Sequence, residues 1–100
     1  MKYFTYILYS KSLDQFYKGH TSDIQQRLTR HNNGYENFTS KGVPWQLIWL
    51  TEKDSKKEAY TLEKKLKNYS RIKTVQFMLK FKDGVVGPDE LLFIEQLSGC

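Results

Sequence analysis

The chain has 100 residues, of which 39% are hydrophobic, and a formal net charge of +5 at pH 7. This length suits one domain with a small core of its own. No apolar run approaches the ~20 residues that a membrane-spanning helix needs, and no signal-peptide pattern follows Met1. The single cysteine, Cys100, excludes an internal disulfide and a cysteine-based zinc site. We therefore expect a cytoplasmic protein with no membrane segment.

The positive charge is concentrated in one part of the chain. Residues 1–54 contain seven Lys and Arg against five Asp and Glu, whereas residues 55–82 contain nine against two. Residues 83–100 contain four acidic residues and no Lys or Arg. A basic segment of this kind favours nucleic acid, because its cations contact phosphates and release counterions. The alternative is a solvated, lysine-rich helix face.

The first elements are predicted to be an antiparallel pair of strands. Residues 2–9 are aromatic and apolar on both alternating faces, which is typical of a central strand. A turn at 10–15 leads to a short returning strand at 16–19. The pairing of these strands is expected to bring Tyr6 and Tyr17 near each other.

A helix and a third strand are predicted next. Ser22 and Gln25 have the spacing of a capping box, so the helix is expected to begin at Ser22 and to end at Gly34. Residues 35–44 are polar and predict a loop. Residues 46–51 are rich in aromatic and branched side chains and predict a strand.

The second half of the chain is predicted to be helical. Ser55 and Glu58 form another capping box, and the helix that follows has an apolar stripe. The stripe consists of Ala59, Leu62, Leu66 and Tyr69. Residues 72–81 have helical spacing, with Ile72, Val75, Met78 and Leu79 as its apolar positions, and residues 89–97 predict a short acidic helix. The apolar residues of this last helix could complete the core or form a dimer face. The order ββαβα plus C-terminal helices predicts an α+β fold with a small three-stranded antiparallel sheet flanked by helices.

Five residues in these elements suit the metal-assisted cleavage of a phosphodiester. Tyr6 and Tyr17 lie on adjacent strands, Arg27 and His31 lie one turn apart on a helix, and Glu63 lies on another helix. Each also has a simpler interpretation. The tyrosines could be packing residues, the histidine structural and the arginine a surface residue, and the glutamate could pair with a lysine four residues on.

The ordered set of motifs resembles the GIY-YIG nuclease domain, in its small bacterial form. The resemblance covers about residues 1–80 and rests on Phe4-Thr5-Tyr6, Tyr17-Lys18-Gly19, Arg27 with His31, Asn32, Pro44-Trp45, and Glu63 within Ala59-Tyr60-Thr61-Leu62-Glu63-Lys64. Four positions depart from the family pattern. Phe4-Thr5 replaces Gly-Ile, Lys18 replaces the central Ile of the second triplet, and His20 stands where several catalytic members have Lys.

The resemblance implies a role for each of the five residues. Glu63 would bind one Mg²⁺ or Mn²⁺, since such a cation needs only one carboxylate besides water and substrate phosphate oxygens. Arg27 would hold the scissile phosphate. Tyr17 would activate the attacking water, with Tyr6 positioning it or sharing that role. His31 could bond the phosphate, orient a tyrosine hydroxyl or relay a proton.

Other residues are expected to contact nucleic acid away from the cleaved bond. The expected phosphate contacts are Lys18, His20, Arg30, Lys41, Lys64, Lys65 and Lys67, of which His20 would replace the family lysine. Tyr35 and Trp45 could stack on exposed bases. Trp45 is equally suited to a core or edge position.

The resemblance implies a divalent-metal-dependent endonuclease that hydrolyses phosphodiester bonds in DNA, with a role in repair or in processing structured DNA. Residues 1–82 would form the nuclease-like part, and residues 83–100 an acidic helical extension of the same domain. One alternative is a binding module for branched, damaged or single-stranded nucleic acid with little turnover. Another is an interaction protein whose acidic end docks on a second chain or on its own basic helix. The choice of DNA or RNA and the presence of a homo-oligomer are left open.

Overall fold

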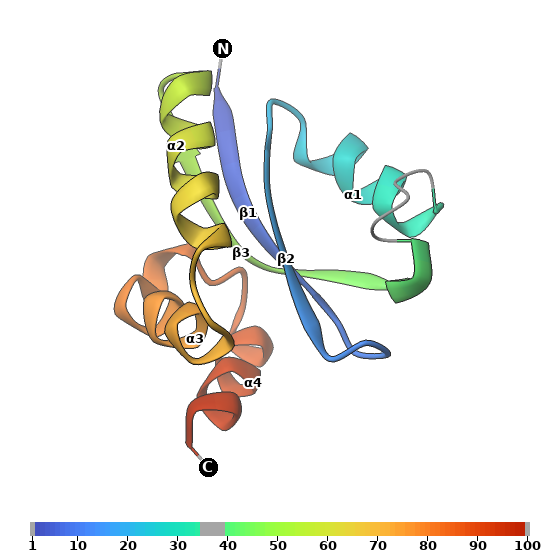
Figure 1. Ribbon diagram of the computed structural model, residues 1–100, viewed down its shortest axis with the longest axis vertical. Coiled ribbons are helices and arrows are strands. Elements are labelled where there is room, and N and C mark those ends of the chain that lie inside the picture. Colours follow the sequence, from blue (N-terminus) through green and yellow to red (C-terminus); the bar gives the residue numbers. More distant parts are fainter. Residues whose placement is uncertain (1, 35–39, 100) are drawn as a thin grey trace.

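An antiparallel sheet of three strands lies at the centre of the computed structural model, which describes residues 2–34 and 40–99 (Figure 1). The strand order is β2-β1-β3, and the strands are β1 (Tyr3–Ser10), β2 (Gln15–Thr21) and β3 (Trp45–Lys53). The central position of β1 is as predicted. A strand that is apolar on both faces has to be covered on both faces.

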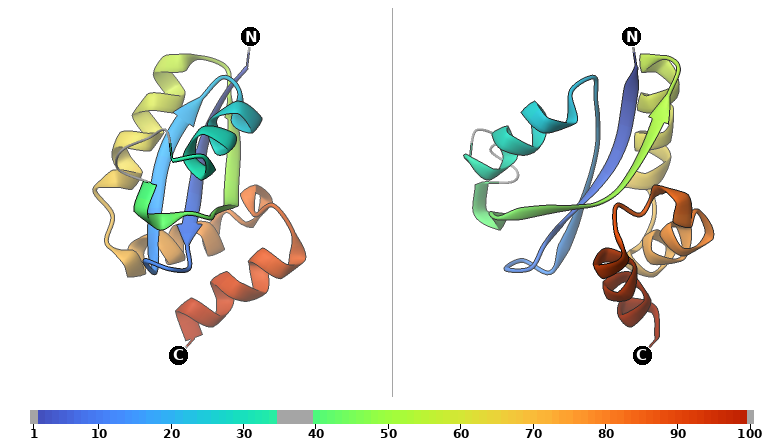
Figure 2. Two further views of the ribbon diagram at one scale, coloured as in Figure 1. Left: turned by 90° about the vertical axis from the view of Figure 1, so that its right-hand side faces the viewer. Right: turned by 180° about the vertical axis from the view of Figure 1, so that it is seen from behind.

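Helices cover the two faces of the sheet, so the predicted α+β class is confirmed (Figures 1 and 2). One helix lies on one face, and three lie on the other. They are α1 (Ile24–Asn32) on the first face, and α2 (Lys56–Lys67), α3 (Arg71–Lys80) and α4 (Pro88–Gly99) on the second. Short 3₁₀ turns occupy η1 (Ser40–Gly42) and η2 (Lys82–Gly84). No helix within the described residues is long and apolar enough to cross a membrane.

The alternating side chains of β1 divide the core into two clusters. Ile7 and Tyr9 point toward the three-helix face, whereas Tyr6 and Leu8 point toward α1. The larger cluster is formed by Ile7, Tyr9, Ile48, Trp49, Leu66, Val75, Met78 and Ile94, and the smaller one by Tyr6, Leu8 and Trp45. The tyrosine of the first triplet is therefore a core residue of the α1 face.

The start of α1 differs from the prediction. The N-cap is Asp23, whose carboxylate accepts the Gln26 backbone N–H at 3.0 Å, and not Ser22. The Thr21 hydroxyl accepts the Asp23 backbone N–H at 3.1 Å, which holds the chain in a turn for one more residue. At α2 the predicted cap is confirmed, since Ser55 accepts the Glu58 backbone N–H at 3.1 Å.

The C-terminal part of the chain packs against β3. The Trp49 indole N–H donates to the Phe81 carbonyl at 2.9 Å. Gly84 permits this close approach, because a Cβ there would lie 2.4 Å from the Trp49 ring. Ile94 of α4 is fully buried in the larger cluster, so α4 completes the core. Ile72 is 70% exposed, and its predicted place on an apolar face is wrong.

Candidate active site

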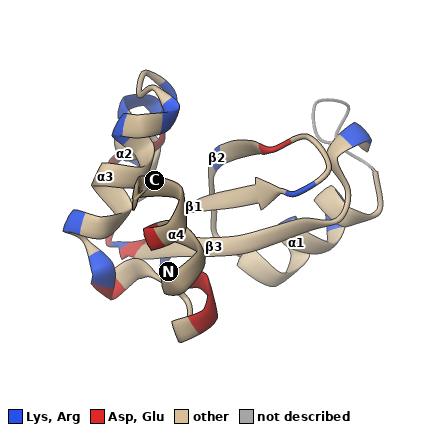
Figure 3. Cartoon of the chain, turned by 90° about the horizontal axis from the view of Figure 1, so that it is seen from below, with Lys and Arg blue, Asp and Glu red and all other residues tan. Residues whose placement is uncertain are grey.

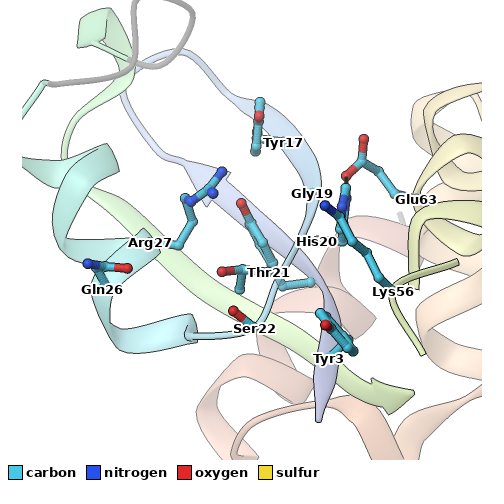
Figure 4. Close-up of a pocket in the computed structure, with 11 residues that line it drawn as sticks. Tyr3, Tyr17, Gly19, His20, Thr21, Ser22, Gln26, Arg27, Lys56 and Glu63 are labelled. Atoms are coloured by element: carbon cyan, nitrogen blue, oxygen red, sulfur yellow. Dashed lines mark hydrogen bonds and ion pairs between the residues drawn. The ribbon is translucent and has the colours of Figure 1, made fainter. Parts of the chain in front are cut away.

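A pocket of about 500 Å³ opens at the edge strand β2, where the two faces of the sheet meet (Figure 4). Tyr6, Tyr17 and Arg27 line it from the α1 face, and His20 and Glu63 line it from the α2 face. These five residues come from four different elements. The structure therefore brings together four of the five predicted catalytic residues and one predicted phosphate contact.

Tyr6 forms the inner wall of the pocket and is 1% exposed. Its hydroxyl is hydrogen-bonded to Nε2 of His31 at 3.2 Å. Burial raises the pKa of Tyr6 well above its ordinary value, and the opposing effect of Arg27 is smaller. The phenol therefore stays neutral at physiological pH.

His31 lies behind the two tyrosines, and its side chain has no exposed surface. Its ring centroid is 4.8 Å from that of Tyr17 and 6.1 Å from that of Tyr6. Among the three predicted roles, this geometry fits the orientation of a tyrosine hydroxyl. A direct phosphate contact would need the ring to reach solvent.

Gly19, the last residue of the second triplet, makes room for Tyr6. The two residues are partners in the β1–β2 register. A Cβ at position 19 would lie 2.4 Å from the Tyr6 hydroxyl oxygen, a distance that real contacts do not reach. The glycine is therefore needed so that the Tyr6 side chain can cross β2 toward His31.

Glu63 lies at the opposite wall and is 8% exposed. Its Oε1 is 2.7 Å from Nδ1 of His20, and its Oε2 is 3.0 Å from Nζ of Lys67. The predicted alternative, an ion pair with the lysine four residues on, is thus present. The hydrogen bond with Glu63 raises the pKa of Lys67, so this lysine remains a cation.

Lys67 links Glu63 to Tyr17 across the edge of the sheet. Its Nζ lies 5.9 Å from the centroid of the half-buried Tyr17 ring. His20, which stands where several catalytic members have a lysine, is bonded to the same carboxylate. Glu63 is therefore shared between His20 and Lys67.

The neighbouring contacts fix the helices that carry the site. The Thr5 hydroxyl donates to the Ala59 carbonyl at 2.9 Å, which ties β1 to α2 one turn before Glu63. The Asn32 side chain accepts the Trp45 backbone N–H at 2.5 Å and donates to the Trp45 carbonyl at 3.2 Å. This pair of bonds ties the end of α1, and hence Arg27, to the start of β3.

The donor set fits a hard divalent cation held mainly by water and substrate. The described residues contain no group of three His, Cys, Asp or Glu that could hold a metal ion. Mg²⁺ needs only one carboxylate when it keeps several waters and takes phosphate oxygens from a substrate. Glu63 can supply that carboxylate if one of its oxygens binds the cation while it stays bonded to His20 or Lys67.

Several predicted contacts lie outside the pocket lining. They are Lys18, Arg30, Lys41, Lys64, Lys65 and Lys67, although Lys67 is paired with the lining residue Glu63. Lys18 lines a separate depression with Asp14 and Arg71 and is half buried, and this burial lowers its pKa. Trp45 is 5% exposed and belongs to the core, so of its two predicted roles the core position is confirmed and the stacking on exposed bases is not. Tyr35 lies outside the described residues.

Lys56 lines the pocket and was missed by the sequence prediction. It precedes Glu63 by seven residues and Lys67 by eleven, so all three share one face of α2. This spacing could have identified it. Tyr3 and Gln26 also line the pocket, but no pattern in the sequence marks them.

Comparisons with known proteins identify the family of this chain. A family model described as the GIY-YIG catalytic domain matches residues 2–76. A UPF0213 protein of Staphylococcus saprophyticus is 33% identical over 78 residues, which cover 77% of this chain and 94% of that protein. A UPF0213 protein of Streptococcus pneumoniae is 31% identical over 83 residues, which cover 82% and 83% of the two chains.

A solved structure is also similar. The solution NMR structure of a UPF0213 protein from Bacillus halodurans has a TM-score of 0.52 and 32% identity. The match covers 90% of this chain and 92% of that one. This chain therefore belongs to the GIY-YIG family, and its relatives are the small UPF0213 proteins.

Proposed function

We propose that this protein is a divalent-metal-dependent endonuclease that hydrolyses phosphodiester bonds in DNA, with structured or damaged DNA as its substrate. The observation that carries the proposal is the convergence of Tyr6, Tyr17, Arg27 and Glu63 on one pocket. These residues supply a proton acceptor, a phosphate-binding fork and a carboxylate within one solvent-accessible space.

The two tyrosines have different roles in this proposal. Tyr6 is buried and keeps its proton, so it serves as a neutral donor whose direction is set by His31. Tyr17 is half buried and is the one that meets the attacking water. Lys67 places a positive charge 5.9 Å from the centroid of the Tyr17 ring. The Tyr17 hydroxyl oxygen accepts the proton of the attacking water as the hydroxyl passes its own proton to solvent.

Arg27 and Glu63 line this space from two different helices, α1 and α2. The guanidinium of Arg27 binds the phosphate through its planar donor fork and stabilises the charge that grows on it during attack. Glu63 would hold the metal ion, which supplies Lewis-acid stabilisation of the phosphate oxygens when bound. His20 keeps the carboxylate in place through its 2.7 Å bond to Oε1.

One observation favours the alternative of a binding module. Both oxygens of Glu63 are already bonded, to His20 and to Lys67. A pocket that could not release either oxygen would bind phosphate without a metal and without turnover. Cleavage and binding therefore have to be measured separately.

The experiment is a cleavage assay on supercoiled plasmid, single-stranded DNA, branched DNA and a matched RNA, each with Mg²⁺, Mn²⁺ or EDTA. We expect metal-dependent cleavage of a DNA substrate that falls ~100-fold or more in Tyr17→Phe. Tyr69→Phe is the matched control, because Tyr69 packs against Phe77 away from the pocket. Salt-sensitive binding of DNA without cleavage of any substrate would support the binding module instead.

A further inference from the structure

A second groove lies on the other side of α2, at the β3 edge of the sheet, and has a volume of about 560 Å³. It shares no lining residue with the pocket at β2. Trp49, Phe77 and Phe81 form its aromatic wall, and four lysines line it. The lysines are Lys53, Lys65, Lys80 and Lys82.

The aromatic wall ends in a ring that is available to a ligand. Trp49 packs against Phe77 at 5.1 Å between ring centroids, and Phe77 packs against Phe81 at 4.9 Å. Phe81 is 47% exposed, and Nζ of Lys80 lies 5.6 Å from its ring. The backbone of Phe81 is held by the bond from Trp49, so the exposed ring has a fixed support.

The four lysines of this groove outnumber its acidic residues. Within residues 2–34 and 40–99, none of the four forms an ion pair, and Asp83 is the acidic residue of the lining. Two neighbouring depressions share Lys65 and add Lys57, Lys73 and one acidic residue, Glu58. Figure 3 shows this basic character on α2 and α3 and the acidic residues on α4. Like charges gathered in this way are stabilised by a bound anion.

We propose that the groove binds single-stranded DNA, with one base stacked on Phe81 and adjacent phosphates on Lys65, Lys80 and Lys82. Stacking on an aromatic side chain beside a basic track is how proteins hold single strands, and a base must be unpaired to reach such a ring. The choice of DNA rests on the proposed function. The groove and the cleavage pocket lie at opposite edges of the sheet, so a single strand flanking the cut would pass over α2.

The first test is an NMR titration of ¹⁵N-labelled protein with a ten-nucleotide oligothymidine in EDTA. We expect the largest amide shifts at residues 65 and 80–84. Under these conditions no cleavage occurs, so the result does not depend on activity. Binding here without cleavage of any substrate would refute the proposed nuclease and leave this site intact. DNA cleavage in the separate assay, with no amide shifts at the groove residues in this titration, would refute the proposed single-strand site and leave the nuclease proposal intact.

Variants then separate the two chemical contributions. Phe81→Ala is expected to weaken oligothymidine binding about tenfold, because stacking is lost while the backbone bond to Trp49 can remain. Lys80→Glu is expected to weaken oligothymidine binding. It should also reduce the slope of log affinity against log salt concentration by about one, the share of one phosphate contact. The matched control is Lys11→Glu, an equal charge change on the exposed β1–β2 turn.

Three results would overturn the proposal. One is an equal loss of affinity in Lys11→Glu and Lys80→Glu, which would mean non-specific attraction to net charge. Another is duplex DNA of the same length that binds the groove as tightly as the single strand. The third is an acidic peptide of equal charge that shifts the same amides with equal affinity and loses none of it in Phe81→Ala.

Discussion

Tyr6 and Tyr17 carry the same phenol group in different surroundings. Tyr6 is 1% exposed and bonded to His31, whereas Tyr17 is half buried beside Lys67. Burial keeps the first in its protonated form, whereas Nζ of Lys67 lies 5.9 Å from the ring centroid of the second. The residue types were visible in the sequence, but this division of roles depends on side-chain burial, which the alternation of a central strand does not specify.

The raised pKa of Tyr6 predicts a loss of stability at alkaline pH. Below pH 10 the phenol is protonated in both the folded and unfolded states, so its contribution to stability is fully present. Above pH 10 the unfolded chain loses this proton and the folded chain keeps it, which lowers the free energy of unfolding by ~1.4 kcal/mol per pH unit. Urea unfolding at pH 9, 10 and 11 should therefore show a steeper decline for wild type than for Tyr6→Phe. Parallel profiles of unfolding free energy against pH for the two proteins would contradict the raised pKa of Tyr6.

Gly19→Ala tests the contact that shapes the pocket. The new Cβ would lie 2.4 Å from the Tyr6 hydroxyl oxygen, so the phenol has to move away from His31. We expect the free energy of unfolding to fall by ~1–3 kcal/mol and DNA cleavage to fall at least tenfold. Thermal unfolding and the cleavage assay measure both. The matched control is Gly99→Ala, where a Cβ meets nothing within 4 Å and neither quantity should fall.

At the scale of the elements, the hydrophobic periodicity predicted the strands and helices. Side-chain hydrogen bonds determine the residues at which the helices begin. Asp23 caps α1 because Thr21 already bonds the Asp23 amide, a contact that spacing alone does not distinguish from a cap at Ser22. Lys56 was missed because it is one of several lysines on α2, and only its register with Glu63 distinguishes it. A run of charged residues indicates an exposed surface. The fold determines which of those charged residues line the same pocket.

The end of α1 provides a prediction at this scale. Asn32→Ala removes both hydrogen bonds to the Trp45 backbone, at 2.5 and 3.2 Å, and frees α1 from β3. The free energy of unfolding should fall by ~1–3 kcal/mol, and cleavage should fall because Arg27 loses its fixed position. Chemical denaturation and the plasmid assay test this. The exposed neighbour Asn33→Ala should change stability by ~0.5 kcal/mol or less, and an equal effect at both positions would contradict the role of Asn32.

At the scale of the whole molecule, α2 separates two surfaces of different chemistry. One side of the helix carries Lys56, Glu63 and Lys67 toward the pocket at β2, and the other carries Leu62 and Lys65 toward the groove at β3. The basic excess of residues 55–82 was visible in the sequence. Its division between two edges of the sheet was not, because that depends on how α2 crosses the strands.

The packing of α4 predicts that the C-terminal helix contributes to global stability. Ile94 is fully buried against the core, whereas Leu92 on the same helix is 59% exposed. Ile94→Ala should lower the free energy of unfolding by ~2–5 kcal/mol through the cavity that it leaves. Leu92→Ala should change it by ~0.5 kcal/mol or less. Similar small effects in both variants would mean that α4 is not part of the cooperative unit.

The central claim is that Glu63 is the carboxylate on which metal-dependent cleavage depends. The most direct measurement compares the rates of Mg²⁺-dependent plasmid nicking by wild type, Glu63→Gln and Glu58→Gln, with thermal unfolding to confirm that each is folded. Glu58 is an exposed acid in the first turn of the same helix and serves as the matched control. We predict a loss of ~100-fold or more in Glu63→Gln and wild-type nicking in Glu58→Gln. Undiminished nicking by a folded Glu63→Gln variant would contradict the account.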